Sequence, residues 1–73
     1  MNNKEYIIKE VRILYRYILE DKEEFKSKKH LYARIYNNLE RNSMCDCGGL
    51  DTLGFTKEEI KQMIKEEIEN YKE

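Results

Sequence analysis

Residues 55–71 are FTKEEIKQMIKEEIENY, and this stretch carries the strongest structural signal in the chain. Thr56 followed three residues later by Glu59 forms a capping box, in which each side chain satisfies a free backbone N–H at a helix start. Phe55 and Ile60 occupy the positions of a hydrophobic staple across the same turn. The stretch therefore predicts a helix that begins directly after Thr56. Its apolar stripe consists of Ile60, Met63, Ile64, Ile68 and Tyr71.

A second helix is predicted near the start of the chain. Asn2 with Glu5 three residues later is typical of a helix N-terminus. Apolar residues then recur at helical spacing from Ile7 to Ile18, and no Gly or Pro occurs before residue 48. We expect this helix to cover residues 3–20.

The apolar pattern fails between residues 20 and 29, which predicts a turn. It resumes from Leu31 to Leu39, and we expect the corresponding helix to end near Asn42. A single long helix through residues 3–42 is the alternative. The predicted fold is therefore all-α: one domain over residues 1–73, a small bundle of two or three helices, with a Cys- and Gly-rich loop before the C-terminal helix.

Length and composition exclude several classes of protein. A chain of 73 residues with 40% charged residues fits one soluble domain. No apolar run approaches the ~18 residues of a membrane span, and the charged start MNNKEYIIKEVR is unlike a secretion signal. We therefore expect a cytoplasmic protein without membrane association. Because ~70 residues rarely enclose a ligand pocket of several hundred Å³, we expect no enzymatic activity.

Charge changes sign along the chain. Residues 21–44 carry six basic and four acidic residues, whereas residues 45–73 carry four basic and eight acidic residues. Carboxylates on a helix can face a basic groove, and complementary charge raises the rate and specificity of association. A solvated helix face is the alternative. We expect the residues that bind a partner to be Glu58, Glu59, Glu66, Glu67, Glu69, Tyr71 and Tyr17.

The motif CDCGG at residues 45–49 points to a metal ion. Two thiolates one residue apart can both face zinc, which takes four Cys, His or carboxylate ligands. The candidate ligands are Cys45, Cys47, Asp46 and His30, although a continuous helix would hold His30 roughly 20 Å from the thiols. Two copies of the chain would instead supply four thiolates. Free thiols or a redox pair are the alternatives, and apart from zinc we expect no cofactor.

Six tyrosines in 73 residues suggest a protein interface, because tyrosine combines a large apolar area with a polar tip. Tyr17, Ile8 and Ile13 lie off the apolar stripe of residues 7–18, so this helix offers a second apolar face to a partner or a dimer. A broad core stripe with amphipathic edges is the alternative. A core this small barely offsets the entropy of folding. We therefore expect stabilisation by zinc, by a homodimer or by both.

In its size, its enrichment in Lys, Glu, Ile, Asn and Tyr, and its lack of a catalytic motif, the whole chain resembles small inhibitor proteins of Firmicute phages and mobile elements. Anti-CRISPR proteins against type II nucleases are similar: small, often helical, with acidic surfaces that occupy nucleic-acid channels. Phage inhibitors of the sliding clamp are a second likeness, because residues 50–55 resemble the clamp-binding hexapeptide at Leu53 and Phe55.

This resemblance implies a non-catalytic protein in the cytoplasm of a bacterial host. It would bind and inhibit a nucleic-acid-handling protein of the host or its defence, with a CRISPR nuclease favoured over the sliding clamp. The alternative function is a small DNA-binding transcription regulator. Phosphate contacts require clustered basic residues, but the acidic last third of the chain would repel nucleic acid. The candidate contacts are Arg12, Arg16, Lys26, Lys28, Lys29 and Arg34.

Overall fold

The computed structural model describes residues 2–46 and 48–71. Within them the chain forms three α-helices and one short 3-10 helix, and no strand. This confirms the predicted all-α fold and decides in favour of three helices. None of the described helices is long and apolar enough to cross a membrane.

Helix α1 (Asn3–Asp21) begins and ends through local contacts. The side chain of Asn2 accepts a hydrogen bond from the backbone N–H of Glu5 at 2.8 Å, as the sequence predicts. Lys22 ends the helix in the left-handed conformation, with φ 54°. The chain then continues as a short connector, so residues 3–42 form two helices and not one.

Helix α2 (Lys28–Asp46) follows Ser27 and is one turn longer than expected. The sequence predicts an end near Asn42, but the helix continues for four more residues. Ser43 explains the difference, because its Oγ donates a hydrogen bond to the carbonyl of Glu40 at 2.8 Å and the residue is fully buried. A serine that satisfies its hydroxyl inside the helix does not compete with the helical backbone.

The segment between α2 and α3 contributes to the core, whereas the sequence predicts only a loop. Gly49 and Gly54 have φ values of 121° and 85°, which only glycine adopts without strain. Between them lies the short 3-10 helix η1 (Leu50–Leu53), and both of its leucines are buried. Asn3 of α1 donates a side-chain hydrogen bond to the carbonyl of Leu53 at 2.9 Å. This contact holds η1 against the start of α1.

Helix α3 (Lys57–Glu69) begins with the predicted capping box. The N–H of Glu59 donates to Oγ1 of Thr56 at 3.1 Å, and the N–H of Thr56 donates to Oε1 of Glu59 at 2.9 Å. Ile60 and Ile64 of the predicted stripe are buried, and Phe55 packs at the edge of the same core. The sequence signal at this helix is therefore confirmed in detail.

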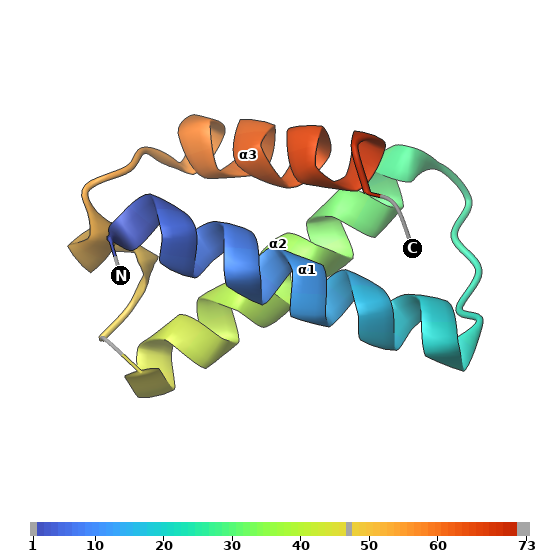
Figure 1. Cartoon of the computed structure of the whole chain (residues 1–73), viewed down its shortest axis with the longest axis horizontal. Coiled ribbons are helices and arrows are strands. Elements are labelled where there is room, and N and C mark those ends of the chain that lie inside the picture. Colours follow the sequence, from blue (N-terminus) through green and yellow to red (C-terminus); the bar gives the residue numbers. More distant parts are fainter. Residues whose placement is uncertain (1, 47, 72–73) are drawn as a thin grey trace.

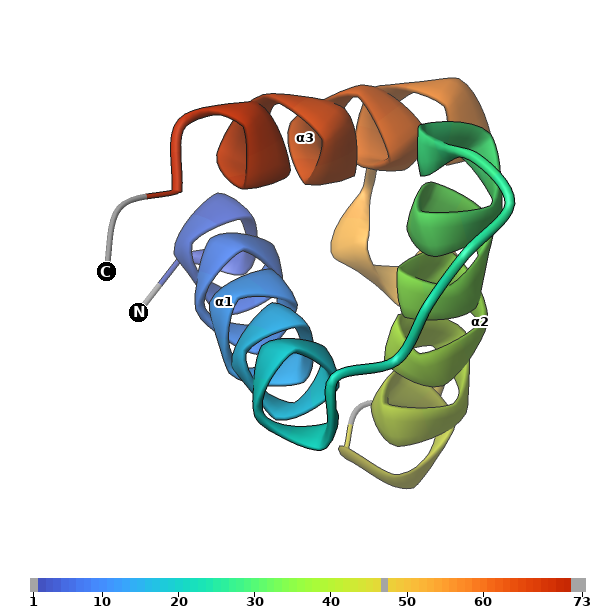
Figure 2. The ribbon, with the colours of Figure 1, turned by 90° about the vertical axis from the view of Figure 1, so that its right-hand side faces the viewer.

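All three helices pack against one another around a single core. Figure 1 shows α1 and α3 running in the same direction, with α2 crossing behind α1 on a diagonal. Figure 2 shows α3 lying across both α1 and α2. The buried side chains among the described residues are Ile7, Val11, Ile18, Ile35, Tyr36, Leu39, Leu50, Leu53, Ile60 and Ile64, with Ser43.

Candidate functional site

Three of the carboxylates predicted to bind a partner face solvent in a row along α3. Glu58, Glu66 and Glu69 are all exposed. Their spacing places them within about 80° of one another around the helix axis. Glu66 accepts a hydrogen bond from the neutral amide of Gln62 at 3.1 Å, and none of the three forms an ion pair with another described residue. We call these three residues the acidic row.

The other two predicted carboxylates interact within the chain. The carboxylate of Glu59 accepts the N–H of Thr56 in the capping box. Glu67 accepts a hydrogen bond from Nε of Arg12 on α1, and only 19% of its side chain is exposed. Both carboxylates therefore stabilise the fold. The positive charge of Arg12, a predicted nucleic-acid contact, is compensated by Glu67.

The two predicted tyrosine anchors lie on different parts of the surface. Tyr17 is 60% exposed, but it lies about 140° around α1 from Arg12, whose side chain reaches α3. Tyr71 packs edge-on against Tyr15, with ring centroids 5.1 Å apart and an interplanar angle of 83°. The structure therefore does not bring Tyr17 together with the acidic row, whereas Tyr71 lies just beyond the end of α3.

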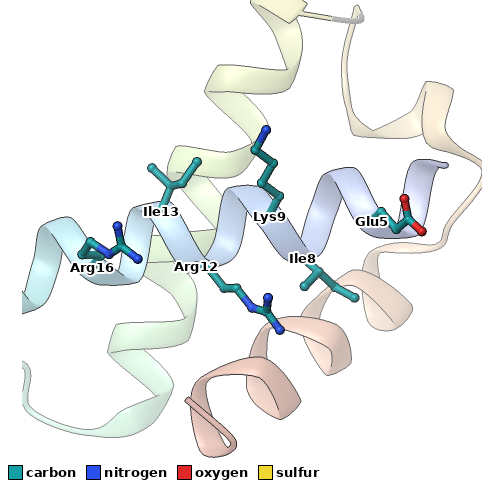
Figure 3. Close-up of a pocket in the computed structure, with 6 residues that line it drawn as sticks. All are labelled: Glu5, Ile8, Lys9, Arg12, Ile13 and Arg16. Carbon is teal, nitrogen blue, oxygen red and sulfur yellow. The ribbon is translucent and has the colours of Figure 1, made fainter. Parts of the chain in front are cut away.

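Figure 3 shows the outer side of α1, where a shallow pocket of about 410 Å³ lies. Its lining includes Ile8 and Ile13, both half-buried, which the sequence analysis assigned to a second apolar face. Because Ile8 and Ile13 are five positions apart in an α-helix, their side chains point about 140° apart around the helix axis. The two side chains therefore do not form one continuous apolar face. The basic side chains Lys9, Arg12 and Arg16 lie around them, with Glu5 at one end.

The predicted basic patch is only partly assembled. Lys26, Lys28 and Lys29 are exposed around the first turn of α2. Arg34 lies a turn further along and pairs with Glu23 of the connector, at 3.4 Å between nitrogen and Oε1. The free positive charge of this region is therefore concentrated at the start of α2.

Two lysines of α3 lie over the ring of Tyr36 on α2. The Nζ atoms of Lys57 and Lys61 are 5.5 Å and 5.7 Å from the ring centroid. Tyr36 is only 9% exposed, and burial raises the pKa of its phenol above the usual value. Three nearby carboxylates, those of Glu40, Asp51 and Glu58, raise this pKa further. The neutral ring is thus held in the seam between α2 and α3.

A groove that was not predicted from the sequence lies along the same contact between α2 and α3. It has a volume of about 330 Å³ and combines lysines of both helices with an aromatic ring. The four-residue spacing of Lys57, Lys61 and Lys65 was its only sequence signal, because the position of α2 beside α3 depends on the tertiary fold. The residues that line the groove are Lys29, Tyr32, Ala33, Glu58, Lys61, Gln62 and Lys65.

The predicted zinc ligands are not gathered within the described part of one chain. Cys45 is an exposed free thiol near the end of α2, whereas His30 lies in its first turn. Because α2 is continuous, their backbones are roughly 22 Å apart, and a site with both residues from one chain is ruled out. The side chain of Asp46 and the whole of Cys47 lie outside the described residues.

No group of three His, Cys, Asp or Glu side chains able to hold a metal occurs among the residues that the structure describes. Zinc held by the thiols of two chains stays a prediction. Metal analysis of the purified protein and of its Cys45→Ser variant tests it.

Neither a protein-family model, nor a curated protein, nor a solved structure matches the chain. The fold and its surface are therefore the basis on which a function is assigned.

Proposed function

We propose that this three-helix protein is a non-catalytic inhibitor that binds a basic nucleic-acid groove on a nucleic-acid-handling protein. The observation that carries the proposal is the acidic row on α3. Its carboxylates are exposed, lie within one sector of the helix surface and form no ion pair with a described residue. A partner with a matching basic groove would gain association rate and specificity from them.

Rigidity of α3 favours this use of the acidic row. The capping box holds its first turn, and Ile60 and Ile64 anchor it in the core. The Arg12–Glu67 ion pair ties its last turns to α1. The backbone that carries these carboxylates is already ordered, so binding costs the entropy of their side chains but little backbone entropy.

A CRISPR nuclease is the partner that we favour, because its nucleic-acid channel is lined by basic residues. The sliding clamp comes second. In the hexapeptide of residues 50–55, Leu53 is buried in the core and Phe55 packs against it. Those side chains would have to leave the core before they could enter a clamp pocket.

The test is capture of a partner from a Firmicute lysate supplemented with a CRISPR nuclease, followed by an inhibition assay. The double variant Glu66→Gln/Glu69→Gln keeps side-chain shape and removes two charges of the acidic row. We expect it to bind the captured protein at least about tenfold more weakly at low salt. The matched control Glu20→Gln/Glu24→Gln removes two exposed charges elsewhere and should bind as the unmodified protein does. Equal binding by both variants would contradict the proposal.

The second candidate is the DNA-binding regulator, favoured by the exposed Lys26, Lys28 and Lys29 at the positive end of the α2 dipole. In that case Lys26→Gln/Lys28→Gln should weaken retention on duplex DNA and reduce its salt dependence. Glu66→Gln/Glu69→Gln should leave retention unchanged or improve it. The two pairs of variants therefore separate the two functions.

A further inference from the structure

A groove of about 330 Å³ runs along the seam where the first half of α2 packs against α3. This volume falls within the range of small-molecule sites in proteins. We propose that the groove binds a nucleotide, that is, a planar base carrying one or more phosphates. The inference goes beyond the proposed function, because it concerns a small ligand in a groove. The groove shares Glu58 with the acidic row, but binding there does not require Glu66 or Glu69.

Three lysines give the groove its preference for an anion. Lys29 comes from α2, and Lys61 and Lys65 come from α3, so positive charge stands on both sides. None of the three forms an ion pair with another described residue. Lys57, Lys61 and Lys65 follow one another at four-residue spacing, where like charges destabilise a helix. A bound phosphate would compensate lysine charges that form no ion pair, because the groove sets three lysines against the single carboxylate of Glu58.

The remaining lining suits a planar base. Tyr32 is half-buried, and its uncovered part lines the groove beside Ala33, whose small side chain leaves room for a ring. A base that stacks on a tyrosine ring gains affinity without sequence preference. The side chains of Gln62 and Glu58 stand on the opposite wall and provide hydrogen-bond donors and acceptors for the edge of the base.

Nearby charge limits the size of this ligand. Glu66 and Glu69 of the acidic row lie on the outer face of the same helix, beside the wall that carries Lys61 and Lys65. A long phosphate backbone that passed over this wall would meet those carboxylates. A free nucleotide, or the phosphorylated end of a single strand, would fit within the groove and avoid them.

The experiment is a two-dimensional NMR titration of the ¹⁵N-labelled full chain. The probes are ATP, adenosine, inorganic triphosphate and a 5′-phosphorylated tetrathymidylate. We expect ATP to shift the amide signals of residues 29–33 and 58–65, and to bind at least about tenfold more tightly than adenosine or triphosphate alone, because stacking and phosphate contacts both contribute. If only the oligonucleotide binds there, the source of the ligand is a strand end, and the site is still supported.

Two variants test the lining. Lys61→Gln/Lys65→Gln should weaken ATP binding about tenfold and reduce its salt dependence. Tyr32→Leu keeps an apolar contact with the core but removes the stacking surface, and should also weaken binding about tenfold. The matched control Lys4→Gln/Lys9→Gln removes the same charge from α1 and should change nothing. Far-UV circular dichroism shows whether each variant is folded. If Tyr32→Leu does not fold, the ATP affinity of Lys61→Gln/Lys65→Gln tests the proposal by itself.

Three outcomes would overturn the proposal. The first is the absence of shifts at millimolar ATP and oligonucleotide. The second is a set of shifts confined to residues 5–16, which would place the ligand on α1. The third is equal affinity for ATP and inorganic triphosphate, which would show a general attraction for polyanions. None of these outcomes bears on partner capture through the acidic row, so the two proposals can fail separately.

Discussion

Arg12 on α1 and Glu67 on α3 form an ion pair that joins the first helix of the chain to the last. The two residues are 55 positions apart in the sequence. The rotation of α3 about its axis is fixed by Ile60 and Ile64, which are buried in the core. In this orientation Glu67 faces α1 and the acidic row faces solvent.

The stability contribution of this pair should be small. Arg12 is 60% exposed, and water screens an ion pair at such a position. In a double-mutant cycle of Arg12→Gln and Glu67→Gln, we expect a coupling free energy of about 0.2–1 kcal/mol, decreasing at high salt. Urea unfolding of the four proteins measures it. A coupling that is large and insensitive to salt would contradict this view of the pair as a surface contact.

Loss of the buried leucine of η1 should be costly. Leu53 is 8% exposed and packs in the core, so Leu53→Ala should lower the free energy of unfolding by about 2–4 kcal/mol. Leu19→Ala is the matched control, since Leu19 is 37% exposed, and its cost should remain below about 1 kcal/mol. Equal costs for the two variants, measured by thermal unfolding, would show that η1 is not part of the core.

The capping box of α3 should contribute measurably to stability. Thr56→Ala leaves the N–H of Glu59 without its acceptor and should lower the free energy of unfolding by about 1 kcal/mol. Thr56→Ser keeps the hydroxyl and should remain close to the unmodified protein. Amide hydrogen exchange provides the local measurement: exchange should quicken in the first turn of α3 in the alanine variant alone. Unchanged exchange there would argue against the cap.

Glycine at the end of α1 should stabilise the protein. Lys22 is the only described residue other than glycine with positive φ, and an L side chain is strained in this conformation. We therefore expect Lys22→Gly to raise the free energy of unfolding by about 0.5–1 kcal/mol. Lys26→Gly, in the connector, is the control and should have no stabilising effect. A lower melting temperature for Lys22→Gly would show that the lysine side chain contributes contacts of its own.

Alkaline pH should reveal the burial of Tyr36. Its pKa is raised in the folded state, first by burial and then by neighbouring carboxylates. The folded state therefore retains the phenolic proton at pH values where the unfolded chain loses it. This contribution to stability is complete below the ordinary tyrosine pKa of about 10 and is lost as pH rises through the folded-state pKa. Tyr36→Phe should weaken the decline of melting temperature with alkaline pH, and a parallel decline in both proteins would contradict the expectation.

Local signals allowed much of the fold to be predicted. The Asn2 cap, the Thr56–Glu59 capping box and the apolar stripes depend on residues within one or two turns of each other, and the structure confirms them. The end of α2 was missed because Ser43 is a poor helix former in isolation and is stabilised here by burial. The role of Leu50 and Leu53 was missed because a Gly-rich segment gives no sign that its leucines reach the core.

The surface was harder to predict than the fold. The carboxylates of the acidic row could be predicted, because they lie on α3, the helix with the clearest sequence pattern. The sequence did not predict that Glu67 pairs with Arg12. It also did not predict that Lys29 lies near Lys61 and Lys65. Both depend on how one helix packs against another, which short-range patterns do not encode.

The hydrogen bond from Asn3 to the carbonyl of Leu53 has a consequence for local unfolding. It joins residues that are 50 positions apart, at the first turn of α1 and at the end of η1. Opening of the first turn of α1 breaks this bond and removes the partner of a carbonyl on η1. We therefore expect fraying at the N-terminus to loosen the segment that precedes α3, so that two regions far apart in the sequence open together.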